Sequence, residues 1–518
     1  MRQVTLYLTT FLLLLVSLTT AAEDGVRYGC RRGHFNPNAV QRRTRGQSVG
    51  RTYLGSCRQL TILASFADQQ FKGDETATLA QWEKILNQKN FQEAPFIGSL
   101  HDYFYAQSYG QFDLTFDLLY IQLNGNRERY RSTSYDDENS QYLVDDIVDV
   151  LLTKDIDYSP YDWDGDGQID QLLIIFAGKG SAYGGFGGGN DAIWPHQWWL
   201  SQHQNLQTDD EDDYRSYRTV SSGGKEYIID CYCAVQELAS DDSYGSFGTI
   251  CHEYSHCLGL PDFYYRSTKI VNRYDLMDSG NYNGNGFYPC NFSAHERMLM
   301  GWLNPTELTT TMTVTHMPAL SDEGHAYMVR NDAVDNEYYI IENRQQTGWD
   351  QDLPGSGLLV FHINYDKDLW EGTAEYVNTT SMKRYYLFHA NNSSTLEGWP
   401  YPYITKDDQG IATITNNELT DTSNPAAVLL NANPDGEKLM SKPITKMSVD
   451  ANGLASFTFM DDETTGIGNA MHIQKDEGNA FYSLDGRRLT SAPARGIYIV
   501  RSASGATRLS TGSRVGCR

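Results

Sequence analysis

The chain has 518 residues, a length that exceeds one ordinary hydrophobic core and favours two to four domains. Hydrophobic residues make up 40% of it and aromatic residues 12%, a composition that excludes an intrinsically disordered polymer. The formal net charge of -25 at pH 7 disfavours nucleic acid and anionic membranes as partners, because like charges repel, and it suits divalent cations.

The N-terminus has the three parts of a secretory signal peptide. Arg2 supplies the positive start, residues 6–18 form a largely apolar run, and Ala21 and Ala22 are small residues suited to cleavage. The alternative, an N-terminal membrane anchor, needs roughly 20 apolar residues, and this run is shorter and interrupted by threonines. We therefore expect residues 1–22 to be a signal peptide and the protein to be secreted or at the cell surface, with no membrane span.

Residues 23–55 are rich in arginine, glycine and asparagine and show little periodicity, which predicts a linker or a pro-segment. Cys30 in this segment could be a thiolate that blocks a metal site before processing, a disulfide partner or a free cysteine. The eight cysteines of the chain are too few for a cysteine-stapled scaffold, and their pairing stays open.

The segment 56–305 alternates between strand and helix patterns, as expected for an α/β domain. The predicted strands are 60–66 and 171–177, and the predicted helices are 79–87, 99–108 and 142–152. From residue 306 the pattern changes to short alternating runs between glycine, asparagine, aspartate and proline. Runs such as 338–342 and 357–363 therefore predict a β-sandwich-like accessory domain over residues 306–462.

Two histidines and an aspartate lie close together in the α/β segment. Apolar residues recur at helical spacing around them, which predicts an amphipathic helix that begins near Ser246. His252 and His256 are four residues apart, so both imidazoles project from one face of this helix and can reach one Zn²⁺. Gly259 marks the helix end, and the turn there allows Asp262 to approach the same ion.

Two histidines and one carboxylate leave a coordination position open for water, which is the arrangement of a catalytic zinc site. Glu253, next to the first ligand, can take a proton from a zinc-bound water. The alternative is a chance HExxH pattern, which the added glycine and aspartate make less credible. Cys251 and Cys257 are expected to be core residues and not zinc ligands.

A methionine turn follows the zinc motif at residues 274–280. With aspartate as the third ligand, these two features resemble the immune inhibitor A-type metalloproteases, a metzincin-like family. The similarity extends over about 56–460 and includes Ser108-Tyr109-Gly110, Ile193-Trp194-Pro195-His196, Gly301-Trp302-Leu303 and Ile341-Glu342-Asn343-Arg344. The resemblance implies a metzincin-like zinc protease domain with ligands His252, His256 and Asp262, base Glu253 and support from Met277. Metzincins more often have histidine as the third ligand.

A second ion site is predicted in an acidic stretch that begins at Asp162. Carboxylates at positions 1, 3, 5 and 9 with glycine at position 6 have the spacing of a Ca²⁺ loop, and the carboxylates are Asp162, Asp164, Asp166 and Asp170. Leu173 stands where such a loop has its bidentate glutamate, so one ligand must come from elsewhere. The alternative is an acidic turn before a strand.

Residues 463–518 are expected to form a small β module, with Asp485 and Gly486 in a hairpin turn and the last clear strand at 496–500. Phe481 to Arg488 and Arg495 to Val500 resemble the C-terminal sorting domains of type IX secretion substrates. That resemblance implies type IX secretion machinery as a partner, and the alternative is a plain β accessory module.

The function expected from these features is that of a secreted zinc endopeptidase. Its partners would be protein or peptide substrates, and Ca²⁺ would have a structural role. The rival from another class is a surface adhesin or glycan-binding protein that uses the β-rich region, with the metal domain as a scaffold. Such a scaffold would have no need of Glu253 as a base.

Overall fold

The computed structural model describes residues 53–131, 139–181, 193–202, 217–371 and 376–461, and four strands after residue 479. The chain forms two compact units, Met1–Asp461 and Asp462–Arg518. The predicted signal peptide, Cys30 and most of the predicted pro-segment lie outside the described residues.

The first unit begins with a five-stranded sheet, which we call the first sheet, in the order β2-β1-β3-β7-β4. Its strands are β1 (Gly55–Ser65), β2 (Phe112–Gln122), β3 (Leu172–Lys179), β4 (His196–Trp199) and β7 (Cys231–Leu238). The first four in spatial order are parallel, and β4 pairs antiparallel with β7. Almost every side chain of β3 and β7 is buried, as expected for parallel strands covered on both faces.

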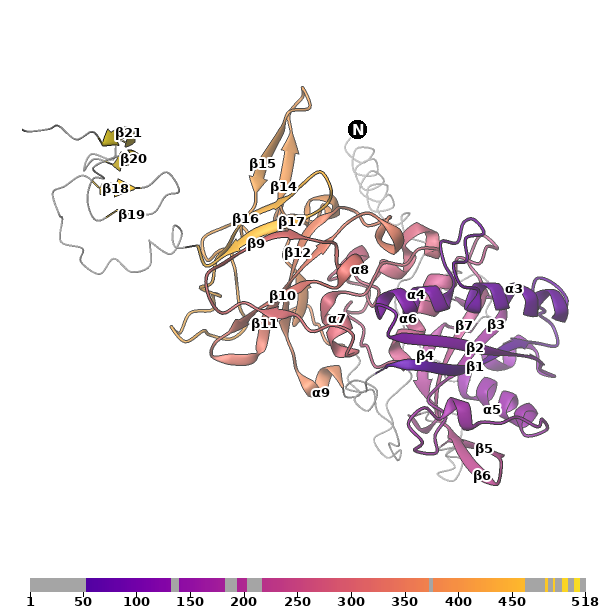
Figure 1. Cartoon of the computed structure of the whole chain (residues 1–518). Coiled ribbons are helices and arrows are strands. Elements are labelled where there is room, and N and C mark those ends of the chain that lie inside the picture. The colour runs from indigo at the N-terminus through magenta and orange to yellow at the C-terminus, as the bar shows by residue number, and fades with distance from the viewer. Residues whose placement is uncertain are drawn as a thin grey trace, which may run out of the picture. The chain divides into compact units, whose positions relative to one another are not determined.

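Helices cover both faces of the first sheet. They are α3 (Glu75–Asn87), α4 (Leu100–Gln107), α5 (Ser140–Leu151) and α6 (Phe247–Cys257). Figure 1 shows α3, α4 and α6 on one side of the sheet and α5 on the other. Asp74 caps α3 with its side chain, and Ser99 and Asp102 form a capping box on α4.

These elements confirm the predicted strands and helices of the α/β segment, with bounds that differ by a few residues. One expectation about α6 is wrong, because this helix is not amphipathic. All eleven of its residues are buried, including its two histidines and Glu253. The polar side chains of α6 therefore face an internal site and not the solvent.

A second sheet, in the order β13-β12-β11-β10-β8, follows in the chain. Its strands are β8 (Thr306–Glu307), β10 (Ala326–Asn331), β11 (Val334–Arg344), β12 (Gly357–Asn364) and β13 (Tyr385–Leu387). The third sheet, in the order β16-β17-β9, consists of β9 (Met312–Met317), β16 (Ile444–Val449) and β17 (Ala455–Phe459). The two strand runs predicted in this region are confirmed as parts of β11 and β12.

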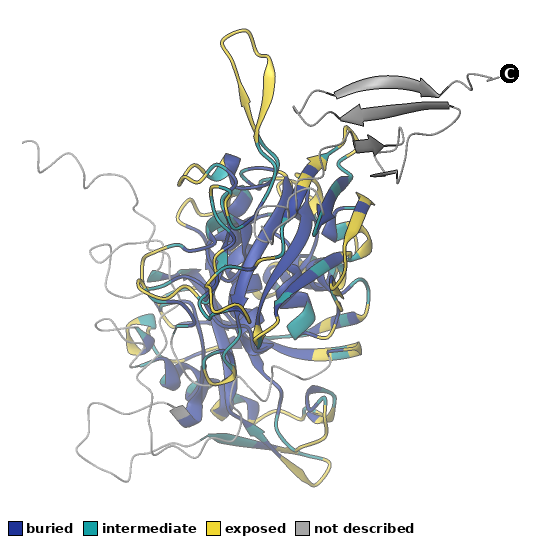
Figure 2. Ribbon diagram, turned by 90° about the vertical axis from the view of Figure 1, so that its left-hand side faces the viewer, coloured by how far each residue is buried: buried dark blue, intermediate teal, exposed yellow. Residues whose placement is uncertain are grey.

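The two faces of the second sheet belong to different hydrophobic cores. Ile340 and Phe361 join the core that also contains Ile174 of the first sheet, which we call the first core. Tyr339 and Val360 join another cluster with side chains of the third sheet, which we call the second core. Every residue of β12 is buried, and Figure 2 shows the central strands of this region mostly in dark blue. The first core is therefore continuous from the first sheet to the second.

The remaining elements of the first unit are short. Two hairpins are formed by β5 (Arg218–Ser222) with β6 (Lys225–Ile229) and by β14 (Tyr403–Lys406) with β15 (Ala412–Asn416). The short α-helices are α7 (Ala294–Leu299), α8 (Leu320–Glu323) and α9 (Lys367–Trp370). The 3₁₀ turns are Arg127–Tyr130, Ser159–Tyr161, Leu200–Gln202, Asn272–Tyr274, Gly280–Gly286, Gly348–Asp350 and Leu396–Gly398.

The second unit contains a four-stranded antiparallel sheet in the order β19-β18-β20-β21. Its strands are β18 (Ala480–Tyr482), β19 (Arg488–Leu489), β20 (Gly496–Arg501) and β21 (Thr507–Gly512). β20 confirms the predicted strand at 496–500, but the expectation that it is the last strand is wrong, because β21 follows it. The predicted turn at Asp485 and Gly486 lies outside the described residues.

Two further observations concern the described part of the chain as a whole. Its six cysteines are all free, and they are Cys57, Cys231, Cys233, Cys251, Cys257 and Cys290. None of its helices combines the length and the apolar character that crossing a membrane requires.

Candidate metal centre

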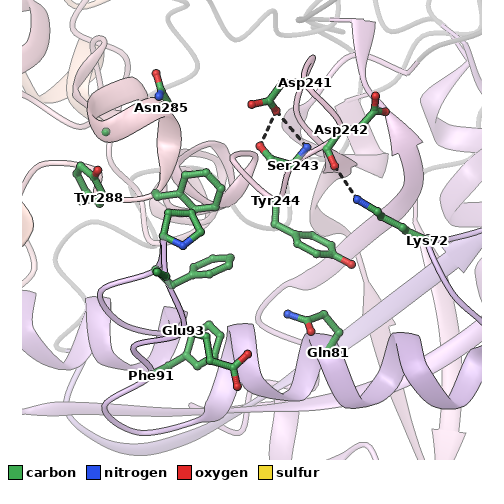
Figure 3. A pocket seen from close by; sticks show the side chains of 15 residues that line it. Lys72, Gln81, Phe91, Glu93, Asp241, Asp242, Ser243, Tyr244, Asn285 and Tyr288 are labelled. Atoms are coloured by element: carbon green, nitrogen blue, oxygen red, sulfur yellow. Dashed lines mark hydrogen bonds between the residues drawn. The ribbon is translucent and has the colours of Figure 1, made fainter.

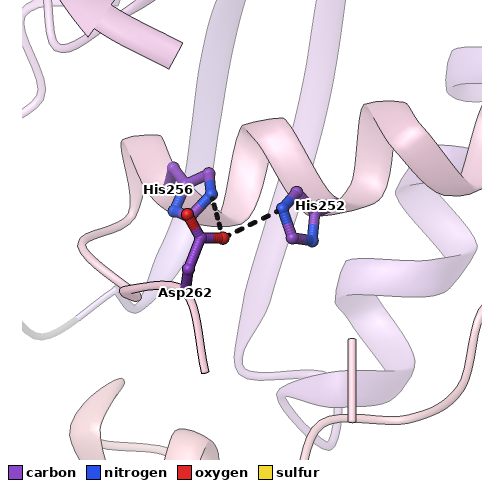
Figure 4. Close-up of side chains that lie close together, drawn as sticks. All are labelled: His252, His256 and Asp262. Carbon is purple, nitrogen blue, oxygen red and sulfur yellow. Dashed lines mark ion pairs between the residues drawn. The ribbon is translucent and has the colours of Figure 1, made fainter. Parts of the chain in front are cut away.

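The candidate metal ligands converge at the C-terminal end of α6, as Figure 4 shows. His252 and His256 are one turn apart on the helix. The chain leaves the helix at Gly259, whose positive φ of 106° suits glycine. The turn brings Asp262 back alongside both rings. One ligand atom from each of the three buried residues lies within 4.8 Å of the others.

Backbone carbonyls fix the orientation of both imidazoles. His252 Nδ1 lies 2.8 Å from the carbonyl oxygen of Leu276, and His256 Nδ1 lies 2.7 Å from that of Leu260. Because a carbonyl oxygen only accepts hydrogen bonds, each Nδ1 must carry the proton. In the neutral form of each ring, Nε2 then keeps its lone pair, and both Nε2 atoms face Asp262.

The Asp262 carboxylate stands between the two Nε2 atoms. Its Oδ1 lies 3.3 Å from His252 Nε2 and 3.1 Å from His256 Nε2. Within the described residues, Asp262 Oδ1 and His256 Nε2 are buried and have no hydrogen-bond partner. Buried polar atoms without partners are costly, and a cation that both can coordinate removes that cost. Two imidazole nitrogens and one carboxylate oxygen are a donor set that fits Zn²⁺.

The charges of the three groups also complement one another. Burial lowers the pKa of His252, but its contact with Asp262 and the charges of Glu253 and Asp262 outweigh burial and raise this pKa to about 9. Burial raises the pKa of Asp262, whereas the charges of His256 and His252 and their contacts hold it well below its usual range. The pocket between the three side chains thus favours an anionic carboxylate facing a positive charge.

Glu253 follows His252 on α6 and is 2% exposed. Its charge is one of the causes that raise the pKa of His252, which places its carboxylate near that ring. The structure thus puts a buried carboxylate beside the first candidate ligand, as the sequence predicted.

The predicted methionine turn lies under the site. Met277 is fully buried, and its backbone N–H donates to Asp275 Oδ1 at 2.8 Å. Its carbonyl oxygen accepts from Phe263 N at 3.0 Å, and the preceding carbonyl, that of Leu276, orients His252. This turn therefore contacts both the first ligand and the segment that carries Asp262.

The acidic loop predicted to bind Ca²⁺ brings three of its four carboxylates together. Asp162, Asp164 and Asp166 offer oxygen atoms within 4.8 Å of one another. Asp170 is not in this group, and its Oδ2 accepts from Trp163 N at 2.6 Å. Asp162 is 8% exposed, and its Oδ1 is buried without a hydrogen-bond partner in the described structure.

A lysine that the sequence did not indicate also reaches this loop. Lys225 Nζ, at the start of β6, lies 2.9 Å from Asp162 Oδ2. The Lys225 ammonium therefore competes with a cation for Asp162 Oδ2, although the lysine side chain is half-exposed. The oxygen donors suit Ca²⁺, and Asp162 Oδ1 remains free to bind it.

Several residues around the zinc site could not be found from the motif. Tyr385 donates from its hydroxyl to Asp275 Oδ2 at 2.8 Å, and Asn378 donates to the carbonyl oxygen of Phe263 at 2.7 Å. Both lie more than 100 residues beyond the zinc motif, and no local pattern signals them. The Ile341–Arg344 stretch, which the sequence marked only as part of the family resemblance, includes Glu342, whose carboxylate accepts from Ala294 N at 2.6 Å.

A cavity of about 480 Å³ lies near the N-terminal end of α6, apart from the metal site (Figure 3). Its wall includes the aromatic residues Phe91, Phe96, Tyr244, Phe287 and Tyr288. Two of its acidic residues are paired with lysines outside the lining, because Glu93 lies 2.7 Å from Lys84 and Asp242 lies 3.0 Å from Lys179. The cavity therefore has little unbalanced charge, and we assign it no ligand.

Residues 56–302 match the family model described as immune inhibitor A peptidase M6, catalytic domain. Immune inhibitor A of Bacillus thuringiensis subsp. alesti is 24% identical over 288 residues, which cover 48% of this chain and 40% of that protein. Pre-pro-metalloprotease PrtV of Vibrio cholerae serotype O1 (strain M66-2) is 29% identical over 199 residues, which cover 33% of this chain and 20% of that protein. The chain thus spans less than half the length of either relative. These similarities support a metallopeptidase, a hydrolase, in residues 56–302.

Proposed function

We propose that this protein is a secreted zinc-dependent endopeptidase that hydrolyses peptide bonds of extracellular proteins. The observation that carries the proposal is the convergence of two carbonyl-oriented imidazoles and one carboxylate on α6 and the turn after it. This convergence lies inside the segment that matches a peptidase catalytic domain. A metzincin-like arrangement of that domain is part of the proposal.

His252 Nε2, His256 Nε2 and the Asp262 carboxylate would hold the zinc ion. When bound there, Zn²⁺ supplies Lewis acidity that polarises the scissile carbonyl and lowers the pKa of water. The Glu253 carboxylate accepts a proton from the attacking water and passes it to the nitrogen of the leaving amine. The burial of Glu253 keeps bulk water away from this proton transfer. The methionine turn keeps His252 in place through the carbonyl of Leu276.

Replacing Glu253 tests this function directly. Glu253→Gln keeps the shape of the side chain but removes its ability to accept a proton, so we expect kcat on a denatured protein substrate to fall by about 10²–10⁴-fold. Zinc content should stay at the wild-type value, because Glu253 is not a ligand. The matched control is Glu83→Gln at an exposed position of α3, which should leave kcat unchanged.

Two outcomes of that experiment would contradict the proposal. One is cleavage that survives both Glu253→Gln and chelation of the metal. The other is a wild-type chain that binds glycans or cell surfaces and never cleaves protein, which would favour the adhesin alternative.

The Asp162 loop is proposed as a structural Ca²⁺ site, supported by the clustered carboxylates and the unpartnered Asp162 Oδ1. Ca²⁺ at about 100 times its Kd should stabilise the zinc-loaded protein by about 2.7 kcal/mol, measured by thermal unfolding. Asp164→Asn should lose most of this gain, whereas Asp408→Asn on an exposed turn should keep it. Equal stabilisation of wild type and Asp164→Asn would place the ion elsewhere.

Export and domain layout are also proposed here. The two sheets that share the second core support a β-sandwich-like region over 306–462. The small antiparallel sheet after residue 479 supports a terminal β module, for which we propose type IX sorting on the resemblance of its sequence alone. N-terminal sequencing of protein recovered outside the cells tests the signal peptide, the pro-segment and their cleavage. An intact N-terminus on protein retained inside the cells would contradict export.

A further inference from the structure

Two residues of the β-rich region reach the segments that carry the metal ligands. Tyr385 lies on β13, and Asn378 lies shortly before it in the chain. Both are fully buried, and both lie beyond residues 56–302, the segment that matches the peptidase family. We propose that Tyr385 and Asn378 are positioning residues of the zinc centre, an inference that rests on the function proposed above.

The first connection runs from Tyr385 to His252. The Tyr385 hydroxyl donates to Asp275 Oδ2 at 2.8 Å, and Asp275 Oδ1 accepts from Met277 N at 2.8 Å. The carbonyl between these two residues, that of Leu276, accepts from His252 Nδ1 at 2.8 Å. The hydroxyl thus holds the carboxylate, the carboxylate holds the turn, and the turn sets the direction of the imidazole. Partners of this kind behind a ligating histidine fix its tautomer and orientation.

The second connection runs from Asn378 to Asp262. Asn378 Nδ2 donates to the carbonyl oxygen of Phe263, the residue after Asp262, at 2.7 Å. The backbone N–H of Phe263 donates to the carbonyl of Met277 at 3.0 Å. Its ring stacks on Tyr385, with 3.9 Å between ring centroids and an interplanar angle of 24°. The residue next to the carboxylate ligand is therefore held at its N–H, its carbonyl and its ring.

The two connections form one unit. Asn378 Nδ2 also donates to the Tyr385 carbonyl oxygen, and Asn378 Oδ1 accepts from Tyr385 N, each at 2.9 Å. Because the pair contacts the ligand segments from a different sheet, docking of the second sheet sets the spacing of His252 and Asp262. The β-rich region thereby completes the metal centre instead of only adjoining it.

A purely structural role is the competing explanation. The Tyr385 hydroxyl also lies 2.9 Å from Ser293 Oγ at the start of α7, so its loss lowers stability in either case. The two roles differ in what they predict for the folded protein. A structural role changes only the unfolding equilibrium, whereas a positioning role changes the affinity and the coordination of the ion at temperatures where the chain is fully folded.

Tyr385→Phe separates these roles, because it keeps the ring that stacks on Phe263 and removes only the hydroxyl. We expect the zinc Kd, measured by chelator competition well below Tm, to rise by about tenfold. The visible absorption of the Co²⁺-loaded protein should change as well, because the ligand geometry changes. Asn378→Ala should change both readouts in the same direction.

Tyr339→Phe is the matched control. Tyr339 on β11 is also fully buried and belongs to the second core, and its hydroxyl donates to the carbonyl of Val428 at 2.7 Å. The control loses one comparable hydrogen bond, so its Tm should fall while the zinc Kd and the Co²⁺ spectrum stay at wild-type values. If Tyr385→Phe behaves as this control does while the wild type binds zinc, the positioning role is overturned and the peptidase proposal stands. A wild-type chain that binds no zinc overturns both.

Discussion

At the scale of single residues, backbone hydrogen bonds orient the candidate zinc ligands. Each imidazole donates from Nδ1 to a backbone carbonyl, although the partners come from different places. Leu276 belongs to the methionine turn, and Leu260 follows the helix that carries His256. The Nε2 atoms consequently point at Asp262 without any change of tautomer. Zinc ligation by these atoms requires each Nε2 to be deprotonated.

Another histidine, away from the ligands, makes stability depend on pH. His295 on α7 is fully buried, and burial lowers its pKa to about 3. Its pKa in the unfolded chain is about 6.5, so below that pH the unfolded state binds a proton that the folded state does not. Stability contributed by this residue is therefore complete above pH 6.5 and is lost as the pH falls towards 3.

Replacing His295 with phenylalanine should remove this contribution, because the site is lined by Tyr338, Trp370 and Tyr385 and suits an apolar ring. Between pH 6.5 and 5, the free energy of unfolding of the wild type should fall by about 2 kcal/mol relative to His295→Phe. His325→Phe on the exposed surface serves as the control and should follow the wild type. A difference between wild type and His295→Phe that does not vary with pH would contradict this assignment.

The sequence was sufficient to predict that three residues would converge, because helical spacing and Gly259 constrain where His252, His256 and Asp262 can lie. It was not sufficient for the residues that hold them. Tyr385 contacts Asp275 across a sequence separation of 110, and Lys225 reaches Asp162 from the β5–β6 hairpin. Such contacts depend on how sheets dock, and a single sequence carries no local signal for that.

At the scale of secondary-structure elements, periodicity located helices α3 to α6 and the strands β1, β3, β11, β12 and β20, but it misjudged the environment of α6. The apolar spacing on this helix is real, but its polar residues line an internal site and are buried too. Strand order in the first sheet also had no local signal, since β7 lies beside β3 only in the folded chain. The proximity of β11 to α7, which a buried charge cluster joins, had no local signal in the sequence either.

Arg344 on β11 is the centre of that cluster. Its guanidinium bonds to both Asp350 carboxylate oxygens at 2.6 Å, to Glu342 Oε1 at 3.0 Å and to the carbonyl of Asn291 at 3.0 Å. Arg344 and Glu342 are fully buried. Burial lowers the pKa of Arg344, but the charges and hydrogen bonds of the carboxylates outweigh this effect and hold the pKa well above its usual value. Removing the guanidinium would leave two buried carboxylates without their counter-ion.

We therefore expect Arg344→Leu to lower the free energy of unfolding by about 3–5 kcal/mol, measured by denaturant titration. The control is Arg129→Leu, which removes a half-exposed ion pair with Asp146 and should cost less than about 1 kcal/mol. Similar losses in the two variants would mean that the buried cluster contributes no more than a surface pair.

At the scale of the whole molecule, the extent of the first core could not be predicted from the sequence, because the core joins segments that are far apart in the chain. The change of pattern at residue 306 is visible in the sequence, yet Ile340 and Phe361 of the second sheet pack in the same core as Ile174 of the first. The peptidase segment 56–302 therefore shares its hydrophobic core with residues that follow it in the chain. Deleting the β-rich region would expose one face of that core. The shared core also brings residues such as Tyr385 close to the segments that carry the metal ligands.

Anomalous X-ray diffraction across the zinc absorption edge, from crystals of the purified chain, tests the central claim most directly. The account predicts one zinc peak about 2.0–2.2 Å from His252 Nε2, from His256 Nε2 and from an Asp262 carboxylate oxygen. The absence of zinc at these three atoms in protein that cleaves a denatured substrate would contradict it.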